Sequence, residues 1–365
     1  MRCGLLINSS CVSRTVGPLG QSLMRRQIVF VLTALWVSVA LSYLPGRDAI
    51  ARTALGVPSG FHEGIYAQGL TNPTALAVGP DRRVYVAEQA GTIVAIGAGG
   101  STVIASGFAT ILGLAWYRHE LYVSSTGQVA VLVPSSGYRT FAARVIVSGL
   151  PTGKHQNDGV AFEGGWMYVG VGSTCNACRE SDPRSATIMR FRPDGSRAQI
   201  FARGLRNPYG LAFRPATGLL YATDNGRDDH GNSVPDELNL MRQGGNYGWP
   251  DCWGRGGGTR CQGTIAPVAL FEPHASADGI VFYAGATYPR RYRGDAFVAE
   301  WGDDVTSLGT GHIVKDVHFS GSGVRVTTFA TGFVHPVAVA VAPDSSLLVA
   351  DWGTGIIWRI QANGH

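Results

Sequence analysis

The sequence predicts an all-β protein, and its composition together with an internal repeat leads to that prediction. Of the 365 residues only 15% are charged, while 50 are glycine and 18 are proline. Long, salt-bridged surface helices need more charge than this, whereas tight turns between strands use glycine and proline. A hydrophobic content of 45% is sufficient for one large domain or two smaller ones.

One pattern recurs six times: Gly-Leu or Gly-Phe, a short turn, a strand of small apolar residues, a second turn and an alternating strand. The small apolar strands of the six copies lie at 75–78, 112–116, 159–162, 211–213, 278–283 and 337–341. The spacing leaves room for four strands in each copy. A strand-only repeat of this kind is typical of a β-propeller, so we expect six four-stranded antiparallel blades. The alternative, a pair of β-sandwiches, does not require the same phrase in each unit.

One further strand is expected before the first copy, at residues 61–67. It can complete the last blade beside residues 356–360, which closes the ring and removes an exposed sheet edge. We therefore expect a six-bladed β-propeller over residues 57–362, closed by an N-terminal strand.

Residues 1–48 have the composition of a leader. Arg25 and Arg26 precede an uncharged run over 28–44, as in the charged and apolar regions of a signal peptide. The run is marginal in length for a bilayer span, so a cleaved signal peptide and an uncleaved anchor both stay open. Met24 can be the true start, in which case the residues before it are not translated. We expect an exported, periplasmic or extracellular protein that meets a membrane only through this segment.

Cysteine usage agrees with export. Downstream of the leader there are four cysteines: Cys175, Cys178, Cys252 and Cys261. An even number in an oxidising compartment favours two local disulfides. The CxxC that begins at Cys175 has an alternative interpretation as a redox motif or half of a zinc site, but no second CxxC or zinc-spaced His pair follows it.

Two side chains are expected to face the central funnel. His155 precedes the inner strand of the third copy, and Arg206 has the equivalent place before the fourth. A neutral imidazole accepts a proton near neutral pH, and an arginine binds an anion or carbonyl oxygen. The structural alternatives are a histidine that bonds only loop backbone and an arginine that pairs with a neighbouring acidic loop.

The acidic loop follows the fourth small apolar strand and its partner, and it contains Asp224, Asp228, Asp229, Asp236 and Glu237. Carboxylates, and the bare backbone carbonyls around Gly226, are ligands that calcium prefers. The loop lacks EF-hand spacing, and a solvated loop is the alternative.

Several function classes have no support. The net charge is +5, but no Lys/Arg run interleaved with aromatic residues occurs downstream of the leader, so nucleic acid is not an expected partner. The sequence also lacks a GxGxxG after a strand, a P-loop and a GxSxG elbow, which argues against dinucleotide, nucleotide and serine-hydrolase chemistry.

Taken together, these residues resemble the glucose/sorbosone dehydrogenase family, soluble sugar dehydrogenases that use pyrroloquinoline quinone (PQQ) on a six-bladed propeller. The likeness spans roughly residues 61–360. Its most specific parts are GLRNPYGLAF at 204–213, DELNL at 236–240, GGNYGWP at 244–250 and the HQNDG around His155.

The resemblance implies oxidation of an aldose or sugar aldehyde, a small-molecule substrate, with electrons leaving to an external acceptor. His155 would be the general base, and Arg206 would stabilise negative charge on the quinone oxygen. Gln156, Asn207 and His335 would be further cofactor contacts.

The resemblance also implies calcium. The backbone carbonyls of Gly226 and Arg227 would hold the ion that polarises the quinone. Glu237 and the carbonyl of Tyr247 would hold a structural calcium.

The chain departs from the glucose-oxidising members of the family. Lys154 and Ser173 stand where those members have Asp. His335 stands where an arginine meets the cofactor's carboxylates, and no lysine is evident near Glu300. Two other functions therefore stay open: a calcium-stabilised binding propeller without catalysis, and a calcium-dependent lactonase, although the acidic residues cluster in a single loop.

Overall fold

A computed structural model describes residues 54–303, 308–321 and 323–364. The expected leader lies outside these residues. The helices of the described part of the chain are short 3-10 turns: η1 (Ser136–Tyr138), η2 (Gly231–Ser233), η3 (Thr259–Cys261) and η4 (Arg290–Tyr292). None of them has the length and apolar character that a membrane span requires.

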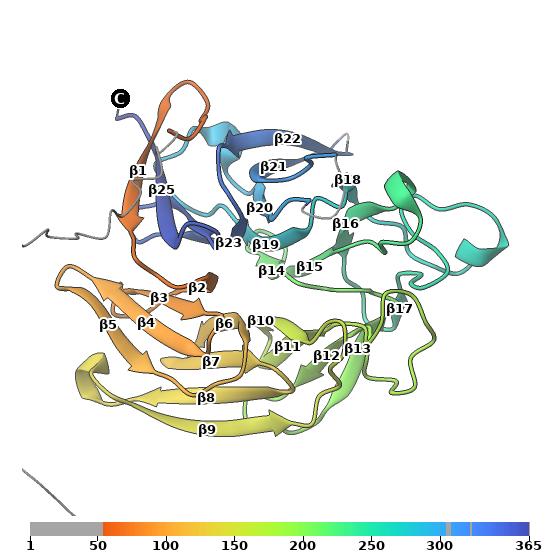
Figure 1. The fold of residues 1–365 in the computed structure, drawn as a ribbon, viewed down its shortest axis with the longest axis horizontal. Helices are drawn as coiled ribbons and strands as arrows, with labels where there is room; N and C mark the ends of the chain where they lie inside the picture. The colour runs from red at the N-terminus through yellow and green to blue at the C-terminus, as the bar shows by residue number, and fades with distance from the viewer. Residues whose placement is uncertain (1–53, 304–307, 322, 365) are drawn as a thin grey trace, which may run out of the picture. The chain divides into compact units, whose positions relative to one another are not determined.

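The strands form six sheets, the blades of a six-bladed β-propeller, which confirms the predicted fold (Figure 1). Blade one contains β2 (Pro73–Val78), β3 (Val84–Glu88), β4 (Thr92–Gly97) and β5 (Gly100–Ala105). Blade two contains β6 (Ile111–Tyr117), β7 (Glu120–Ser125), β8 (Gln128–Pro134) and β9 (Phe141–Ser148). Blade three contains β10 (Asn157–Glu163), β11 (Trp166–Val171), β12 (Thr187–Phe191) and β13 (Gln199–Arg203).

The second half of the ring repeats this arrangement. Blade four contains β14 (Leu211–Arg214), β15 (Leu219–Asp224), β16 (Pro235–Leu240) and β18 (Ala269–Pro273). Blade five contains β19 (Ala277–Phe282), β20 (Ala296–Glu300), β21 (Ile313–Ser320) and β22 (Gly323–Thr331). Blade six contains β23 (Pro336–Val341), β24 (Leu347–Asp351), β25 (Ile356–Ala362) and, from the N-terminal side of the chain, β1 (Phe61–Ala67).

Strand β1 closes the ring as predicted. It pairs antiparallel with β25, with Phe61 opposite Ala362 and Ile65 opposite Trp358. The first and last strands of the described chain thus share one sheet, and the blade presents no unpaired edge between them.

Blade three differs from the predicted four strands because it gains a fifth, β17 (Gly245–Asn246), which pairs in parallel with β13. This short strand belongs to the GGNYGWP turn that leaves blade four. The backbone N–H of Tyr247 donates to the Arg203 carbonyl at 2.9 Å, and that of Trp249 donates to the Gly204 carbonyl at 3.0 Å. The turn therefore joins two neighbouring blades.

The inner strands β2, β6, β10, β14, β19 and β23 surround the central channel (Figure 1). Their residues are small because the strands lie very close together. A Cβ added at Gly159 would lie 2.5 Å from the Tyr209 carbonyl oxygen, and one at Gly279 would lie 2.7 Å from that of Val337. Real side chains do not tolerate such contacts, which explains the small apolar strand in each copy of the repeat.

In blades one to four, the alternating strand supplies a tyrosine that packs edge-on against an aromatic residue of the next blade's inner strand. Ring-centroid distances are 4.6–5.2 Å for the pairs Tyr85–Trp116, Tyr122–Phe162, Tyr168–Phe213 and Tyr221–Phe282. These edge-to-face contacts bury large apolar surfaces and hold neighbouring blades at a constant relative orientation.

Closure of the ring is expected to depend on Phe61. Its ring is buried edge-on against Tyr288 (4.7 Å), Tyr292 (5.4 Å) and Phe329 (5.4 Å). We expect Phe61→Ala to lower the free energy of unfolding by about 3–5 kcal/mol, measured by denaturant titration, because the cavity cannot fully collapse. Ile65→Ala, at an exposed position of the same strand, should cost less than about 1 kcal/mol. Equal losses for the two variants would contradict this role for Phe61.

Candidate active site

The loop that enters each inner strand is held, in three of the blades, by a carboxylate at the end of the second strand. Asp224 ends β15, and it accepts the backbone N–H groups of Arg206 at 3.1 Å and Asn207 at 2.7 Å. Glu88 and Asp351 make equivalent bonds in blades one and six. The backbone at Arg206 and Asn207 is thereby fixed at the mouth of the channel.

Blade three has no such carboxylate, because β11 ends in Val171. The fully buried Ser173 holds the entry loop instead. Its carbonyl oxygen accepts the His155 backbone N–H at 3.0 Å, and its Oγ lies 3.0 Å from His155 Nδ1. A Cβ added at Gly172 would lie 2.5 Å from the His155 Cβ, so the histidine packs against a bare backbone.

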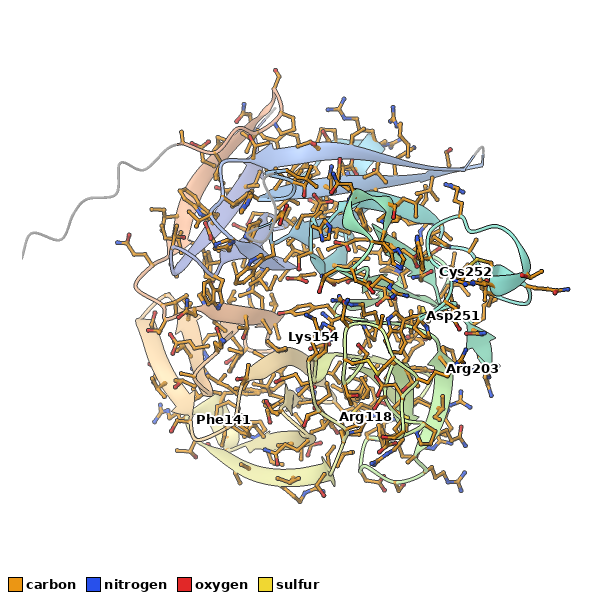
Figure 2. The ribbon with its side chains drawn as sticks, turned by 45° about the vertical axis from the view of Figure 1, so that its right-hand side comes forward. Arg118, Phe141, Lys154, Arg203, Asp251 and Cys252 are labelled. Carbon is orange, nitrogen blue, oxygen red and sulfur yellow. A yellow bond between two sulfur atoms is a disulfide. The ribbon has the colours of Figure 1, made fainter. Side chains whose placement is uncertain are left out.

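His155 lies in a pocket of about 350 Å³ whose lining also includes Lys154, Gln156, Asp158 and Asn207. Figure 2 shows Lys154 toward the middle of the ring of blades. Burial, together with the positive charges of Arg206 and Lys154, lowers the pKa of His155 to about 3. The imidazole is therefore neutral at ordinary pH and can accept a proton at Nε2, the nitrogen that faces away from Ser173.

The Arg206 guanidinium is buried and forms an ion pair with the acidic loop. This pairing was the structural alternative to anion binding that the sequence left open. Nη2 lies 2.7 Å from Asp228 Oδ2, while Asn176 and the Asn225 carbonyl accept further N–H groups. These partners use four of the five guanidinium N–H donors. Burial lowers the pKa of Arg206, and the neighbouring carboxylates oppose that shift.

Two residues that line the His155 pocket have buried polar atoms without partners. Neither Asn207 Oδ1 nor Asp158 Oδ2 has a hydrogen-bond partner among the described residues, although both atoms are buried. Gln156 differs, because Thr126 Oγ1 donates to its Oε1 at 2.6 Å and its Nε2 donates to the Thr110 carbonyl at 3.0 Å. Buried polar atoms are normally bonded, so the Asn207 amide fits a polar ligand in this pocket.

The residues expected to bind metal line one small cavity of about 20 Å³. Gly226, Arg227, Glu237 and Tyr247 all contribute to its wall, as does Asp224. The cavity is large enough for a single ion or water molecule, whereas the resemblance implied two calcium ions, one at Gly226 and Arg227 and a structural one at Glu237 and Tyr247. The acidic loop is thus only partly solvated: Asp228 and Asp229 are exposed, whereas Asp224, Asp236 and Glu237 are buried.

The charges around this cavity favour a cation. Burial raises the pKa of Glu237 to about 7 and that of Asp236 to about 6, although backbone N–H groups donate to both carboxylates. Burial, reinforced by the charge of Glu237, also raises the pKa of Asp224 well above its usual value. Asp224 and Glu237 line the cavity and Asp236 does not, so a bound cation would stabilise the ionised forms of Asp224 and Glu237. These carboxylates and the nearby backbone carbonyls fit calcium.

His335 lies apart from both cavities, in the entry loop of blade six. Its ring stacks on Trp301 at a centroid distance of 4.5 Å, and Trp352 packs against both rings, 4.6 Å from Trp301 and 5.9 Å from His335. The two residues that meet here between blades five and six, Trp301 and His335, are therefore aromatic, and neither is a lysine or an arginine.

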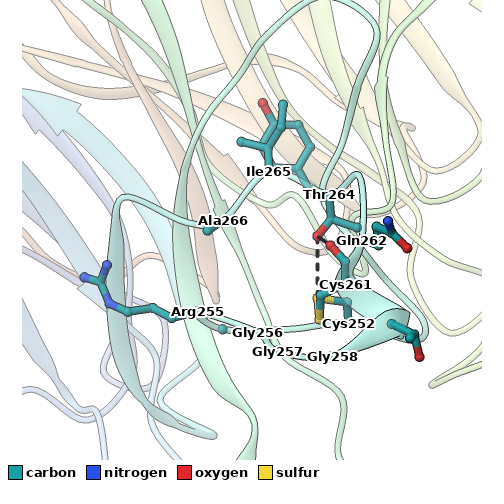
Figure 3. A pocket seen from close by; sticks show the side chains of 13 residues that line it. Cys252, Arg255, Gly256, Gly257, Gly258, Cys261, Gln262, Thr264, Ile265 and Ala266 are labelled. Carbon is teal, nitrogen blue, oxygen red and sulfur yellow. Dashed lines mark hydrogen bonds between the residues drawn. A yellow bond between two sulfur atoms is a disulfide. The ribbon is translucent and has the colours of Figure 1, made fainter.

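The structure contains the disulfides Cys175–Cys178 and Cys252–Cys261. Cys175 and Cys178, with Glu180, form the close group of three metal-type ligands found in the described residues, but the two sulfurs are bonded to each other. Cys252 and Cys261 close a glycine-rich loop around a larger hollow of about 480 Å³ (Figure 3). Tyr247, an expected calcium ligand, also lines that hollow, whereas His155 and Arg206 do not.

Sequence reasoning missed two residues that organise the site. Ser173 was noticeable only as a departure from the family pattern, although it bonds directly to His155. Asn176, inside the CxxC, gave only the weak signal of a polar residue between two cysteines, yet it holds Arg206.

Comparison with known proteins extends these observations. The sequence profile of the glucose/sorbosone dehydrogenase family matches residues 141–326, which is 186 of the 365 residues. The chain is 28% identical over 167 residues to the aldose sugar dehydrogenase YliI of Escherichia coli, covering 39% of this chain and 44% of that protein.

Two solved structures have the same fold. A protein of Thermus thermophilus described as an oxidoreductase (glucose dehydrogenase) has 26% identity and a TM-score of 0.66, covering 82% of this chain and all of that one. The PQQ-bound aldose sugar dehydrogenase of Streptomyces coelicolor has 23% identity and a TM-score of 0.67, covering 84% of this chain and 99% of that one. Because the family profile spans more than half of the sequence, and the blades and entry loops agree with it, this chain belongs to the glucose/sorbosone dehydrogenase family.

Proposed function

We propose that this protein is an oxidoreductase that oxidises an aldose or a sugar aldehyde with the help of PQQ and calcium. The observation that carries the proposal is the neutral, partly buried His155, which lines one pocket with Asn207, whose amide oxygen is buried without a partner. Membership of a dehydrogenase family gives independent support. The PQQ named for the Streptomyces protein and the aldose named for the Escherichia coli protein suggest the cofactor and substrate classes.

In this proposal His155 acts as the general base. Its Nε2 accepts the proton of the substrate hydroxyl as the carbonyl or lactone product forms. When bound, PQQ supplies the two-electron acceptor for the reaction. Lys154 and Arg206 place positive charge beside the pocket, where negative charge develops on oxygen.

Binding of the cofactor would rest on Asn207 and on nearby cations. The Asn207 amide faces the pocket, and its backbone is fixed by Asp224. Lys154 forms an ion pair with Asp228 at 3.1 Å and is half-exposed, so it can reorient toward an anionic ligand. We propose His335 as a stacking contact through its Trp301 cluster, because the rings packed around it are aromatic.

Calcium would be held by the Gly226 and Arg227 carbonyls and by Glu237 with the Tyr247 carbonyl. The support is that all four residues line one ion-sized cavity. A lactonase centre is less favoured, because it needs several carboxylates on one ion. Apart from the disulfide-bonded Cys175–Cys178 with Glu180, the described residues bring no three metal-type side-chain ligands close together.

Reconstitution tests the enzyme. We expect the purified protein with PQQ and calcium to reduce an acceptor dye when aldoses or sugar aldehydes are added. His155→Ala should lower kcat by about 10²–10⁴-fold, because it removes the general base. The thermal stabilisation by calcium should persist in that variant.

The matched control is His62→Ala, an exposed histidine of β1, which should keep the wild-type rate. Absence of any PQQ-dependent turnover in the wild-type protein would instead favour a binding propeller.

Calcium removal tests the cation cavity. Addition of calcium at 100 times its Kd to chelator-treated protein should stabilise the fold by about 2.7 kcal/mol, measured by thermal unfolding. We expect Glu237→Gln to abolish most of this gain, because the variant removes the buried anionic ligand. Asp229→Asn, on the exposed side of the same loop, should retain it. A full calcium response from the Glu237 variant would place the ion elsewhere.

The pH profile tests the environment of His155. Because its pKa is about 3, far below the usual 6.5, the base stays unprotonated down to acidic pH. We expect kcat/KM to stay constant between pH 7 and about pH 4.5. It should not fall near pH 6.5, as it would if an ordinary histidine were the base. Loss of activity with an apparent pKa of 6–7 that His155→Gln removes would contradict the lowered pKa.

The same shift affects stability. The unfolded chain takes up the His155 proton more readily than the fold does. The stability contributed by this group is therefore complete above pH 6.5 and is lost as the pH falls toward 3.

A further inference from the structure

The Cys175–Cys178 loop is connected by hydrogen bonds to both residues expected to be catalytic, His155 and Arg206. Three groups make the connection: the Ser173 hydroxyl, the Ser173 backbone and Asn176. The first step is the Ser173 hydroxyl. Its Oγ donates to the Cys175 carbonyl oxygen at 2.7 Å, and the same Oγ lies 3.0 Å from His155 Nδ1. A hydroxyl has one proton, and a carbonyl oxygen can only accept a hydrogen bond. The Ser173 hydroxyl proton is therefore donated to the Cys175 carbonyl oxygen. His155 Nδ1 must then be the donor, which leaves the lone pair on Nε2.

The second step is the Ser173 backbone. Its N–H donates to the Arg206 carbonyl oxygen at 2.7 Å, and its carbonyl oxygen accepts the His155 N–H at 3.0 Å. One buried residue therefore connects the entry loops of blades three and four. Within the described chain no strand pairing holds this point, because β11 ends at Val171 and the next strand, β12, begins at Thr187.

The third step is Asn176, which lies between the two cysteines. Its Oδ1 accepts N–H groups from Arg206 Nη2 at 2.9 Å and from the Asp228 backbone at 3.0 Å. Its carbonyl oxygen accepts from Arg206 Nε and from Trp249 Nε1, both at 3.2 Å. The orientation of the guanidinium thus depends on where Asn176 is held.

The disulfide is what closes this loop. Residues 174–178 are only half-buried and belong to no strand or helix. Besides the disulfide and the bonds to Asn176, the loop is tied at Thr174. The Thr174 N–H and Oγ1 both donate to the Glu180 carboxylate, and its carbonyl oxygen accepts the Lys154 N–H at 2.8 Å. A covalent link across four residues limits the conformations that carry the Cys175 carbonyl and the Asn176 side chain away from their partners.

We propose that the Cys175–Cys178 loop is a redox-sensitive positioning element, which fixes the Nδ1–H tautomer of His155 through Ser173 and the orientation of Arg206 through Asn176. The inference rests on the proposed function for its catalytic consequence, but the tautomer and the loop contacts are properties of the protein alone. Two-electron reduction by a dithiol cleaves the S–S bond to two thiols and oxidises the reductant to its own disulfide. The loop then loses its covalent closure, and both side chains lose their fixed positions.

The direct test is ¹⁵N NMR of the apo protein with labelled histidine, with the His155 signals assigned from a His155→Gln spectrum. We expect the Nδ1–H tautomer in the oxidised wild-type protein. Ser173→Ala and the double variant Cys175→Ser/Cys178→Ser should each populate the Nε2–H tautomer. Ser346→Ala, which removes a buried hydroxyl in blade six, is the matched control and should leave the His155 signals unchanged.

Kinetics of the reconstituted enzyme provide the second readout. We expect the cysteine double variant, or wild-type protein treated with dithiothreitol, to lose at least about 10-fold in kcat, because the wrong tautomer cannot accept the proton. The double variant keeps Ser173, so it tests the loop even where Ser173→Ala fails to fold. Circular dichroism should show the intact β-sheet spectrum in each variant that is scored.

Three outcomes overturn the proposal: an Nε2–H tautomer in the oxidised wild-type protein, unchanged His155 signals in the folded double variant, or an unchanged kcat in that variant. Absence of turnover in the wild-type protein is a different result. It rejects the dehydrogenase function, while the NMR comparison still decides whether the disulfide loop positions His155.

Discussion

The convergence of six inner strands on one channel is the constraint on which the rest of the structure depends. Those strands approach so closely that Gly159 and Gly279 have no room for a side chain. Because the strands are this close, the loops that enter them also meet at one mouth. His155 and Asn207, which lie fifty-two positions apart in the chain, line a single pocket for this reason.

The blades hold their entry loops by different chemistry, and that difference matters for His155. Blades one, four and six use carboxylates, which add negative charge to the loop. Blade three uses the neutral hydroxyl and carbonyl of Ser173. A carboxylate next to an imidazole would raise its pKa, whereas Ser173 leaves burial and two nearby cations to lower it. The neutral Ser173 therefore adds no negative charge that would oppose the lowering of the His155 pKa.

Much of the fold was predictable because it follows from repeated local patterns. The sequence shows the alternating strands with tyrosine and the inner strands of small residues as recurring patterns. It also shows the closing strand at 61–67 as one more strand before the first copy. The partners of Arg206 were not predictable to the same degree. Its ion pair with the acidic loop was one alternative, but Asn176 contacts it from the disulfide-closed loop that follows β11. Contacts of this kind depend on the path of irregular backbone, which a repeating sequence pattern does not predict.

The metal-binding expectations show the same division. The family motifs suggested Gly226, Arg227, Glu237 and Tyr247, and these residues do line one cavity. The burial of Asp224 and Asp236 was not evident from the sequence, since five acidic residues in one loop suggest a solvated surface. Pairing along β15 and β16 carries those two side chains inward while Asp228 and Asp229 stay exposed.

The closing strand has a consequence for how the protein is made. Among the strands of the described residues β1 comes first and its partner β25 last, and the bond between His62 and Asn363 spans 301 positions. During synthesis β1 has no partner until the last blade has emerged, and contacts so distant in sequence form late and slowly. The ring of blades therefore stays unclosed until the last blade has been synthesised. A truncation in the final blade would remove the partner of the first strand as well as the blade itself.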